Sequence, residues 1–256
     1  MNEIDLMFGD DEEVEKHEER PTNSGVLKFH EGTEEALFVF VKSKAVQGDA
    51  PGVLAAIDEF CYTRHWMMHI GDKKLTFLNN AIDTMKSLHR HEPRRTLVEL
   101  GAYCGYSAVS IASRLEPGRD MLYSIENNEH CVFWTQRMVN YAGVQDRVTV
   151  LKYRGGECSA WKALLHTDSI HLLFIDHDKR QYLPDLKTIE GEGLLQTNAV
   201  VVADNVVVFG LQEYFQYVRD PHGPFKSSQL FEDTIEYATS ESEREQKDGI
   251  EVSIHK

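Results

Sequence analysis

Polar residues follow two apolar runs of the chain in a pattern that suits a hard metal ion. The run that ends at Ile175 is followed by Asp176, and the run that ends at Ala203 is followed by Asp204 and Asn205. If these runs are neighbouring parallel strands, their carboxyl ends meet at the sheet edge where open α/β folds bind ligands. Two carboxylates and an amide supply the oxygen ligands that Mg²⁺ prefers. We therefore predict a magnesium site here, against the alternative that each aspartate only caps a following helix.

A glycine-containing turn follows the first apolar run. The segment from Glu99 reads ELGAYCGYS, in which Gly101 and Gly105 permit a tight turn and close approach of the backbone to a ligand at a helix N-terminus. The second run ends at Glu126, 25 residues after Gly101, and an acid about 20 residues beyond such a turn typically binds the ribose hydroxyls of a nucleoside. These features predict an adenosine-containing ligand without a 2′-phosphate. The alternatives are an ordinary strand-to-helix turn and a solvent-exposed acid.

The elements that position these residues alternate as the strands and helices of an α/β protein do. Short apolar, β-branched runs alternate with helical stretches, which predicts a parallel sheet covered by helices on both faces. The last part of the chain predicts an antiparallel hairpin at the sheet edge, with strands Phe231–Ala238 and Ile250–Ile254 around the polar insert Thr239–Gly249. The fold class is therefore a doubly wound, mostly parallel α/β sheet. Its five parallel strands are expected at Thr96–Leu100, Met121–Ile125, Val148–Leu151, Ile170–Ile175 and Ala199–Ala203.

The chain before the sheet divides into an acidic tail and a helical region. The first twenty residues carry nine acids but only the bases Lys16 and Arg20, so we expect residues 1–30 to be disordered. Helical spacing begins at Thr33, near Ala50 and after Gly71. We expect one domain over residues 31–256, with a helical part at 33–92 and a sheet core at 96–256.

Composition excludes several classes of protein. The chain has 256 residues with 27 Lys and Arg against 42 Asp and Glu, a net charge of −15, and lacks the basic stripe that nucleic-acid binding requires. No apolar run approaches the roughly 20 residues that span a bilayer, and the acidic start is unlike a signal peptide. The four cysteines are too widely spaced for C-x-x-C pairs. We expect a cytoplasmic monomer with reduced thiols that binds neither membrane nor nucleic acid.

Taken together, these motifs resemble the catechol O-methyltransferase family. The similarity runs from about Ala50 to the C-terminus. It implies a Rossmann-like methyltransferase fold with a seven-stranded sheet, and an S-adenosylmethionine-dependent enzyme that requires Mg²⁺. The matching segments are Trp66-x-Met68, Ile70-Gly71-Asp72, Glu99–Ser107, Asp176-His177-x-Lys179, Tyr182-Leu183-Pro184-Asp185 and Ala203-Asp204-Asn205-Val206.

The resemblance also implies roles for individual residues. The metal ligands are the three residues already named, Lys179 is the general base, and Glu236 holds the second hydroxyl of the acceptor. Gly155 and Gly156 stand where the family has a Ser-Gln pair, so only backbone contacts to the adenine are expected there. The implied cofactor-binding residues are Ile70, Glu99, Gly101, Tyr103 and Ser107 at the methionine end, Glu126 at the ribose, Asn127 and Gly155 at the adenine, and Asp176 and His177.

The implied acceptor is a small diphenol in a slot that departs from the family at two positions. Asp178 stands where the family usually has a tryptophan, and Phe209 stands where it usually has a proline. Asp178 either faces the slot and attracts a cationic acceptor or points to solvent at a helix start. The full set of substrate-binding residues is Trp66, Met68, Asp178, Lys179, Asn205, Phe209, Ile235 and Glu236.

Two other functions stay open. The enzyme could act on another diphenol, of flavonoid or caffeoyl type. Alternatively, the chain could be a non-catalytic protein of methyltransferase fold that binds S-adenosylmethionine, or binds a protein partner through its acidic tail. The joint presence of Asp176, Lys179, Asp204, Asn205 and Glu236 argues against the non-catalytic protein, which has no need of all five.

Overall fold

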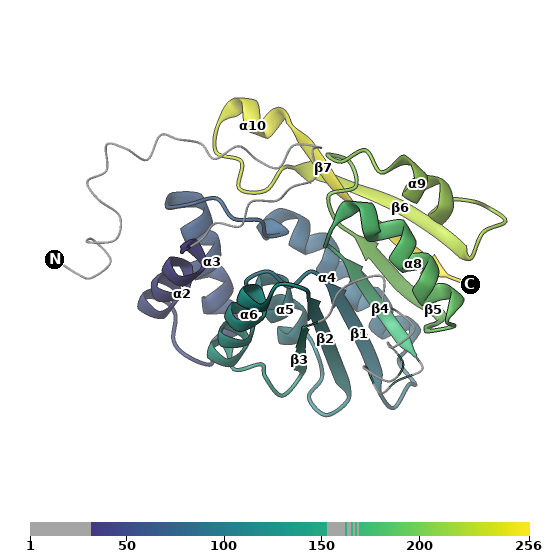
Figure 1. Cartoon of the computed structure of the whole chain (residues 1–256), viewed down its shortest axis with the longest axis horizontal. Coiled ribbons are helices and arrows are strands. Elements are labelled where there is room, and N and C mark those ends of the chain that lie inside the picture. Colours follow the sequence, from purple (N-terminus) through teal and green to yellow (C-terminus); the bar gives the residue numbers. More distant parts are fainter. Residues whose placement is uncertain (1–31, 153–161, 163–164, 166, 168) are drawn as a thin grey trace.

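A seven-stranded mixed sheet in the order β3-β2-β1-β4-β5-β7-β6 forms the centre of the protein (Figure 1). The computed structural model describes residues 32–152, 162, 165, 167 and 169–256. The predicted acidic tail of residues 1–30 lies outside them. Strands β1 to β5 are parallel, whereas β7 is antiparallel to both β5 and β6. The strands are β1 Arg95–Leu100, β2 Asp120–Glu126, β3 Val148–Lys152, β4 Ile170–Ile175, β5 Leu195–Ala203, β6 Phe225–Thr234 and β7 Lys247–His255.

Helices cover both faces of the sheet, which confirms the predicted doubly wound α/β class. One face packs against the helices that precede β1 and those that follow β1 and β2, and the other packs against the helices that follow β4 and β5. The first set is α2 Thr33–Lys44, α3 Ala50–Thr63, α4 Gly71–Leu88, α5 Tyr106–Ser113 and α6 Glu129–Ala142. The second is the 3-10 helix η2 Lys179–Gln181, α8 Tyr182–Gly191 and α9 Gln212–Val218.

The two cores explain why the strands are continuous apolar runs. Leu172 and Phe174 of β4 belong to the core under α2 to α6, whereas Leu173 and Ile175 belong to the core under α8 and α9. Successive side chains of a strand point to opposite faces, so a sheet buried on both sides needs apolar residues at every position. The polar residues that follow the strands are therefore concentrated at one edge of the sheet.

The C-terminal hairpin is present, but its first strand was predicted too late in the chain. The expected strand Phe231–Ala238 overlaps only the end of β6, and the chain leaves the strand at Thr234. Tyr237 has a φ of 53°, a left-handed conformation that does not occur in a strand. The first half of β6 escaped prediction because β6 is an edge strand that pairs only with β7 and carries exposed polar residues such as Lys226. The polar insert contains the short helix α10 Glu241–Glu245, which starts with a capping box between Ser240 and Glu243.

Two further expectations concern cysteines and membranes. Cys61, Cys104 and Cys131 are buried free thiols, and Cys158 lies outside the described residues. Within the described ranges, no helix combines the length and the apolar character that crossing a membrane requires.

Candidate active site

The turn after β1 is shaped by glycines and touches the end of β4. Gly101 has a φ of 97° and Gly105 a φ of 87°, which is the region that favours glycine. A Cβ atom on Gly101 would lie 2.3 Å from the carbonyl oxygen of Asp176, so any larger residue would push β1 and β4 apart. Tyr103, between the two glycines, also has a positive φ of 46°. The predicted turn is thus a close-packed loop beside the first predicted metal ligand.

Glu126 at the end of β2 holds this turn in place. Its Oε2 accepts hydrogen bonds from the backbone N–H groups of Ala102 at 3.2 Å and Tyr103 at 3.1 Å. Its Oε1 accepts from the N–H of Asn128 at 2.9 Å, and Asn128 in turn caps α6. The neighbouring Asn127, predicted to lie beside an adenine, is exposed. The carboxylate predicted for the ribose therefore also fixes the loop geometry, at the sheet edge where a nucleoside would lie.

Glu99 is a carboxylate that is completely buried at the end of β1. The Ser124 hydroxyl donates to its Oε2, whereas Oε1 has no hydrogen-bond partner among the described residues. Burial raises the pKa of Glu99 to about 7, because the charged form loses its hydration. A cationic ligand group at Oε1 would supply the missing partner.

The other predicted cofactor residues surround the same edge. Ile70 is buried directly before α4, and Ser107 is buried in the first turn of α5. The hydroxyl of Tyr103 is buried and has no hydrogen-bond partner in the described part of the chain. His177 contacts Asp185 through Nε2 at 2.8 Å, and its buried Nδ1 likewise lacks a partner among the described residues. Gly155 lies outside the described residues.

Lys179 lies between the ends of β4 and β5. Its Nζ donates to Oδ1 of Asp176 at 2.8 Å and to the hydroxyl of Tyr182 at 2.6 Å. The Tyr182 hydroxyl donates to the backbone oxygen of Asp204 at 3.1 Å. The ring of Phe209 lies 5.6 Å from Nζ, within the range of a cation–π contact. The predicted base, one predicted metal ligand and one predicted slot wall therefore form a single group, which Tyr182 links to the second metal ligand.

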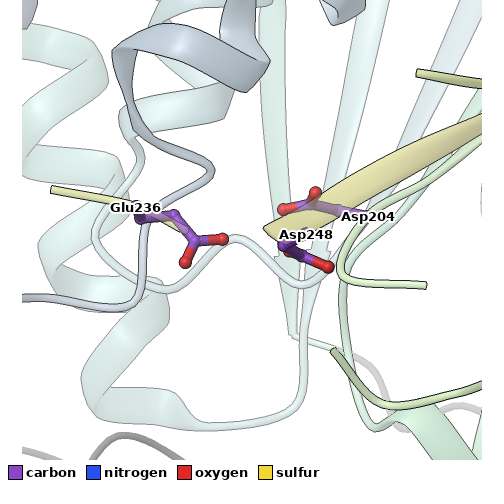
Figure 2. Close-up of side chains that lie close together, drawn as sticks. All are labelled: Asp204, Glu236 and Asp248. Carbon is purple, nitrogen blue, oxygen red and sulfur yellow. The ribbon is translucent and has the colours of Figure 1, made fainter. Parts of the chain in front are cut away.

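A second group contains three acids around a buried lysine. Figure 2 shows the carboxylates of Asp204, Glu236 and Asp248 close together, and one oxygen of each lies within 4.8 Å of the others. Nζ of Lys74 is 2.7 Å from Asp204 Oδ1 and 2.6 Å from Asp248 Oδ2, and it also pairs with Glu236 Oε1. Burial opposes its charge, but the three carboxylates raise the pKa of Lys74 well above its ordinary value. The three carboxylates therefore favour the charged form of Lys74.

Asn205 connects the same acids from the end of β5. It has a φ of 55°, a left-handed conformation that asparagine tolerates better than most residues. Its Nδ2 donates to Glu236 Oε1 and to Asp248 Oδ2, both at 2.8 Å. These two bonds fix the amide and direct Oδ1 away from both carboxylates.

Asp178 does not act as an isolated anion. Its carboxylate accepts hydrogen bonds from the backbone N–H of Arg180 and from the guanidinium, with Nη2 at 2.6 Å. Arg180 lowers the pKa of Asp178. This geometry favours the alternative in which Asp178 starts a helix, because it is the N-cap of η2.

The remaining slot residues line the start of α4 and the end of β6. Trp66 and Met68 are partly buried against the core under α2 to α6, and Ile235 is buried. Gly71 packs against Glu236, because a Cβ atom on Gly71 would lie 3.3 Å from both Cβ and Cγ of that residue. The motif before α4 thus sets the position of the acid predicted to hold the acceptor.

Sequence reasoning missed Lys74 and Asp248. Lys74 shares the buried face of α4 with Leu78, Ala81 and Met85, and a lysine on an apolar helix face is a recognisable signal because lysine is rarely buried unless it is paired. Asp248 gave no such signal, because it belongs to the segment predicted as a polar insert. In the structure it is fully buried at the start of β7.

Comparisons with known proteins agree with this fold. A sequence profile described as a methyltransferase domain matches residues 98–206. The chain is 37% identical over 224 residues to a catechol O-methyltransferase of Bos taurus, which covers 87% of this chain and 76% of that protein. It is 36% identical over 218 residues to catechol O-methyltransferase B of Danio rerio, covering 84% of this chain and 75% of the relative.

Solved structures share the fold at lower identity. An O-methyltransferase of Streptomyces achromogenes in complex with S-adenosylmethionine matches with a TM-score of 0.57 and 18% identity, over 89% of this chain and 99% of that one. An O-methyltransferase of Bacillus cereus in complex with S-adenosylhomocysteine matches with a TM-score of 0.52 and 18% identity, over 78% and 97% of the two chains.

Proposed function

This chain belongs to the catechol O-methyltransferase family, and we propose that it transfers a methyl group from S-adenosylmethionine to one hydroxyl of a catechol bound to Mg²⁺. The observation that carries the proposal is the link between two groups of side chains. Asp176 and Lys179 form one group, Asp204 and Glu236 belong to the other, and the Tyr182 hydroxyl bonds to both Lys179 and the backbone of Asp204. A base, hard oxygen ligands and a second carboxylate thus meet at one edge of the sheet.

Three buried polar atoms are consistent with the proposed S-adenosylmethionine site. Glu99 Oε1, the Tyr103 hydroxyl and His177 Nδ1 are all buried without hydrogen-bond partners among the described residues. A buried polar group without a partner is costly, so such atoms indicate a ligand. Glu99 would bind the ammonium group of the methionine part, and Glu126 would accept the ribose hydroxyls.

The proposed Mg²⁺ site fits the donor set at the ends of β4 and β5. The contacts of Lys179 and Lys74 use Oδ1 of Asp176 and Oδ1 of Asp204, and Asn205 uses Nδ2. Oδ2 of each aspartate and Oδ1 of Asn205 would be the ligands, a hard oxygen set that suits Mg²⁺. The ion, when bound, would lower the pKa of an acceptor hydroxyl and stabilise the phenolate.

The residues of this chain have separable tasks in the transfer. The reaction is an in-line displacement in which the oxygen–methyl bond forms as the sulfur–methyl bond breaks, so alignment of the acceptor is the main requirement. Lys179 would accept the hydroxyl proton at Nζ. Glu236 would accept a hydrogen bond from the second hydroxyl, and Phe209 and Ile235 would cover the aromatic ring.

A methyl-transfer assay over a panel of diphenols tests the proposal. The panel contains simple catechols, catecholamines, flavonoids and caffeoyl compounds, each with and without Mg²⁺. We expect Mg²⁺-dependent transfer to vicinal diols and no transfer to matched monophenols, because only a diol chelates the ion and reaches Glu236. Efficient transfer to monophenols would contradict the proposal, and a preference for caffeoyl or flavonoid diols would identify the acceptor class.

A further inference from the structure

The proposed reaction leaves one prominent feature without a role, the fully buried Lys74. Its side chain is 1% exposed, and a buried ammonium is tolerated only when its donors are satisfied. Its Nζ donates hydrogen bonds to Asp204 and Asp248 and forms an ion pair with Glu236. Lys74 is therefore surrounded by three carboxylates.

The cluster that Lys74 fills has the composition of a metal site. Three carboxylate oxygens within 4.8 Å of one another are an arrangement that holds a divalent cation when it is unfilled. One of the three, Asp204, is also a proposed Mg²⁺ ligand through its other oxygen. Two cation positions therefore share Asp204, in the manner of a two-metal site.

The contacts of Lys74 leave one cation position open rather than two. Its Nζ occupies the space between one oxygen each of Asp204, Glu236 and Asp248, so the open position is the one at the other oxygen of Asp204. A second divalent ion would need the position that Lys74 occupies.

The same contacts hold Glu236 in place. Its Oε1 is bound by Lys74 and by Nδ2 of Asn205, and its aliphatic part packs on Gly71. Asp248, the third acid, is itself fixed by the backbone N–H of Val208 at 3.1 Å. With Oε1 occupied by these donors, Oε2 is the oxygen of Glu236 that is available to an acceptor hydroxyl.

We propose that Lys74 is a positioning residue, the built-in cation that occupies the second cation position of the site. Its ammonium restricts the enzyme to one divalent ion and holds Glu236 in place for the second hydroxyl of the acceptor. This inference rests on the proposed function, because it assigns Lys74 to the same acceptor site.

The test counts metal ions in Lys74→Met. Metal-stripped protein is titrated with Mn²⁺, and free Mn²⁺ is measured by electron paramagnetic resonance. We expect one bound ion per chain in the wild type and two in Lys74→Met, where Mn²⁺ replaces the ammonium. The matched control is Lys73→Met, the neighbouring lysine of α4, which donates to the Thr234 hydroxyl at 2.7 Å. It should bind one ion, as the wild type does.

Kinetics supply the second readout. At a Mg²⁺ concentration that fills only the first position, Lys74→Met should raise KM for catechol at least about tenfold, the cost of losing one held hydrogen-bonding partner, and leave KM for S-adenosylmethionine within about twofold. If Lys74→Met does not fold, Lys74→Met/Asp248→Asn removes one charge of each sign, and the same rise in KM is expected.

The outcomes separate this inference from the proposed function. Two ions in the wild type, one ion in folded Lys74→Met, or an unchanged KM for catechol in whichever variant folds would each overturn the role of Lys74. A wild type that methylates no diphenol would instead refute the proposed function, and the Mn²⁺ count would still decide whether Lys74 occupies a cation position.

Discussion

The proposed cofactor side and the proposed acceptor side of the site are built from different kinds of interaction. On the cofactor side, Glu126 binds the backbone N–H groups of Ala102 and Tyr103, which are 24 and 23 residues away along the chain. On the acceptor side, Lys74 binds the side chains of Asp204 and Asp248, which are 130 and 174 residues away. The first kind of contact fixes the backbone of one turn through a nearby acid, whereas the second joins charged side chains from distant parts of the chain.

Metal removal should produce the largest difference in effect between the two sides of the site. We expect EDTA to lower the methyl-transfer rate by about 10³-fold, because the acceptor side would lose its main stabilising charge. Binding of S-adenosylmethionine, measured by calorimetry, should change less than about twofold, because Glu99 and the glycine turn do not need the ion. Added Mg²⁺ is the control and should restore the rate. Full turnover in metal-free buffer would show that the acceptor side does not depend on the ion, and would contradict this prediction.

The base should show the next largest effect. Lys179→Met should lower kcat by about 10²-fold, the usual scale for a positioned general base, with unchanged affinity for S-adenosylmethionine. Lys187→Met is the matched control, because Lys187 is an exposed residue of α8 whose Nζ lies 4.9 Å from the Tyr217 ring. Equal kcat values for wild type and Lys179→Met would assign Lys179 a purely structural pairing with Asp176.

The cofactor side should respond to pH through Glu99. Its pKa of about 7 in the folded protein means that the carboxylate protonates as the pH falls below 7. The affinity for S-adenosylmethionine should then weaken by up to about tenfold per pH unit. Calorimetric titrations at pH 8, 7, 6 and 5 measure this dependence. Glu99→Gln should bind weakly at every pH, and a flat profile in the wild type would show that Glu99 does not bind the ammonium group.

Glu99 also links pH to the stability of the ligand-free protein. Because its folded pKa lies above the ordinary value of 4.5, its contribution is fully favourable below about pH 4.5 and is lost as the pH rises through about 7. Thermal melts of wild type and Glu99→Gln across this interval should therefore diverge as the pH rises, with the wild type less stable at the alkaline end. Parallel melting curves would contradict the raised pKa.

The smallest effect is expected at Asp178. Arg180 already pairs with its carboxylate at the surface, and exposed ion pairs contribute little to stability. Asp178→Asn should therefore change the ratio of KM values for a catecholamine and a neutral catechol by less than about twofold. Arg180→Ala is the informative partner variant, because it unmasks the anion. A large loss of catecholamine preference in Asp178→Asn alone would place Asp178 in the acceptor slot.

Local patterns made the fold and the cofactor side predictable. Strands buried on both faces appear in the sequence as continuous apolar runs. The turn after β1 is recognisable from its glycines, which adopt positive φ angles. Each is encoded within a few residues of where it acts. The edge strand β6 was misplaced because an edge strand carries polar residues on its exposed positions, so its apolar pattern is weak.

The acceptor side could be predicted only in part. Asp176, Asp204 and Asn205 were predicted because strand ends mark them, whereas Asp248 lies at a strand start inside a polar segment. The roles of Lys74 and Asp248 can be inferred only from their contact with each other. That contact joins residues 174 apart along the chain, so the local spacing of residues does not predict it. Charge balance is a property of the folded site that no single motif carries.

The position of β7 has a consequence for the order in which the protein assembles. β7 is the last strand of the chain, yet it lies between β5 and β6, and it delivers Asp248 to Lys74. Ribosomes release the N-terminal part of a chain first. Until β7 inserts, β6 has no strand to pair with and Lys74 lacks one of its three counterions. The turn after β1 and its contacts with Glu126 can therefore form on a nascent chain before Lys74 has met all three of its carboxylates.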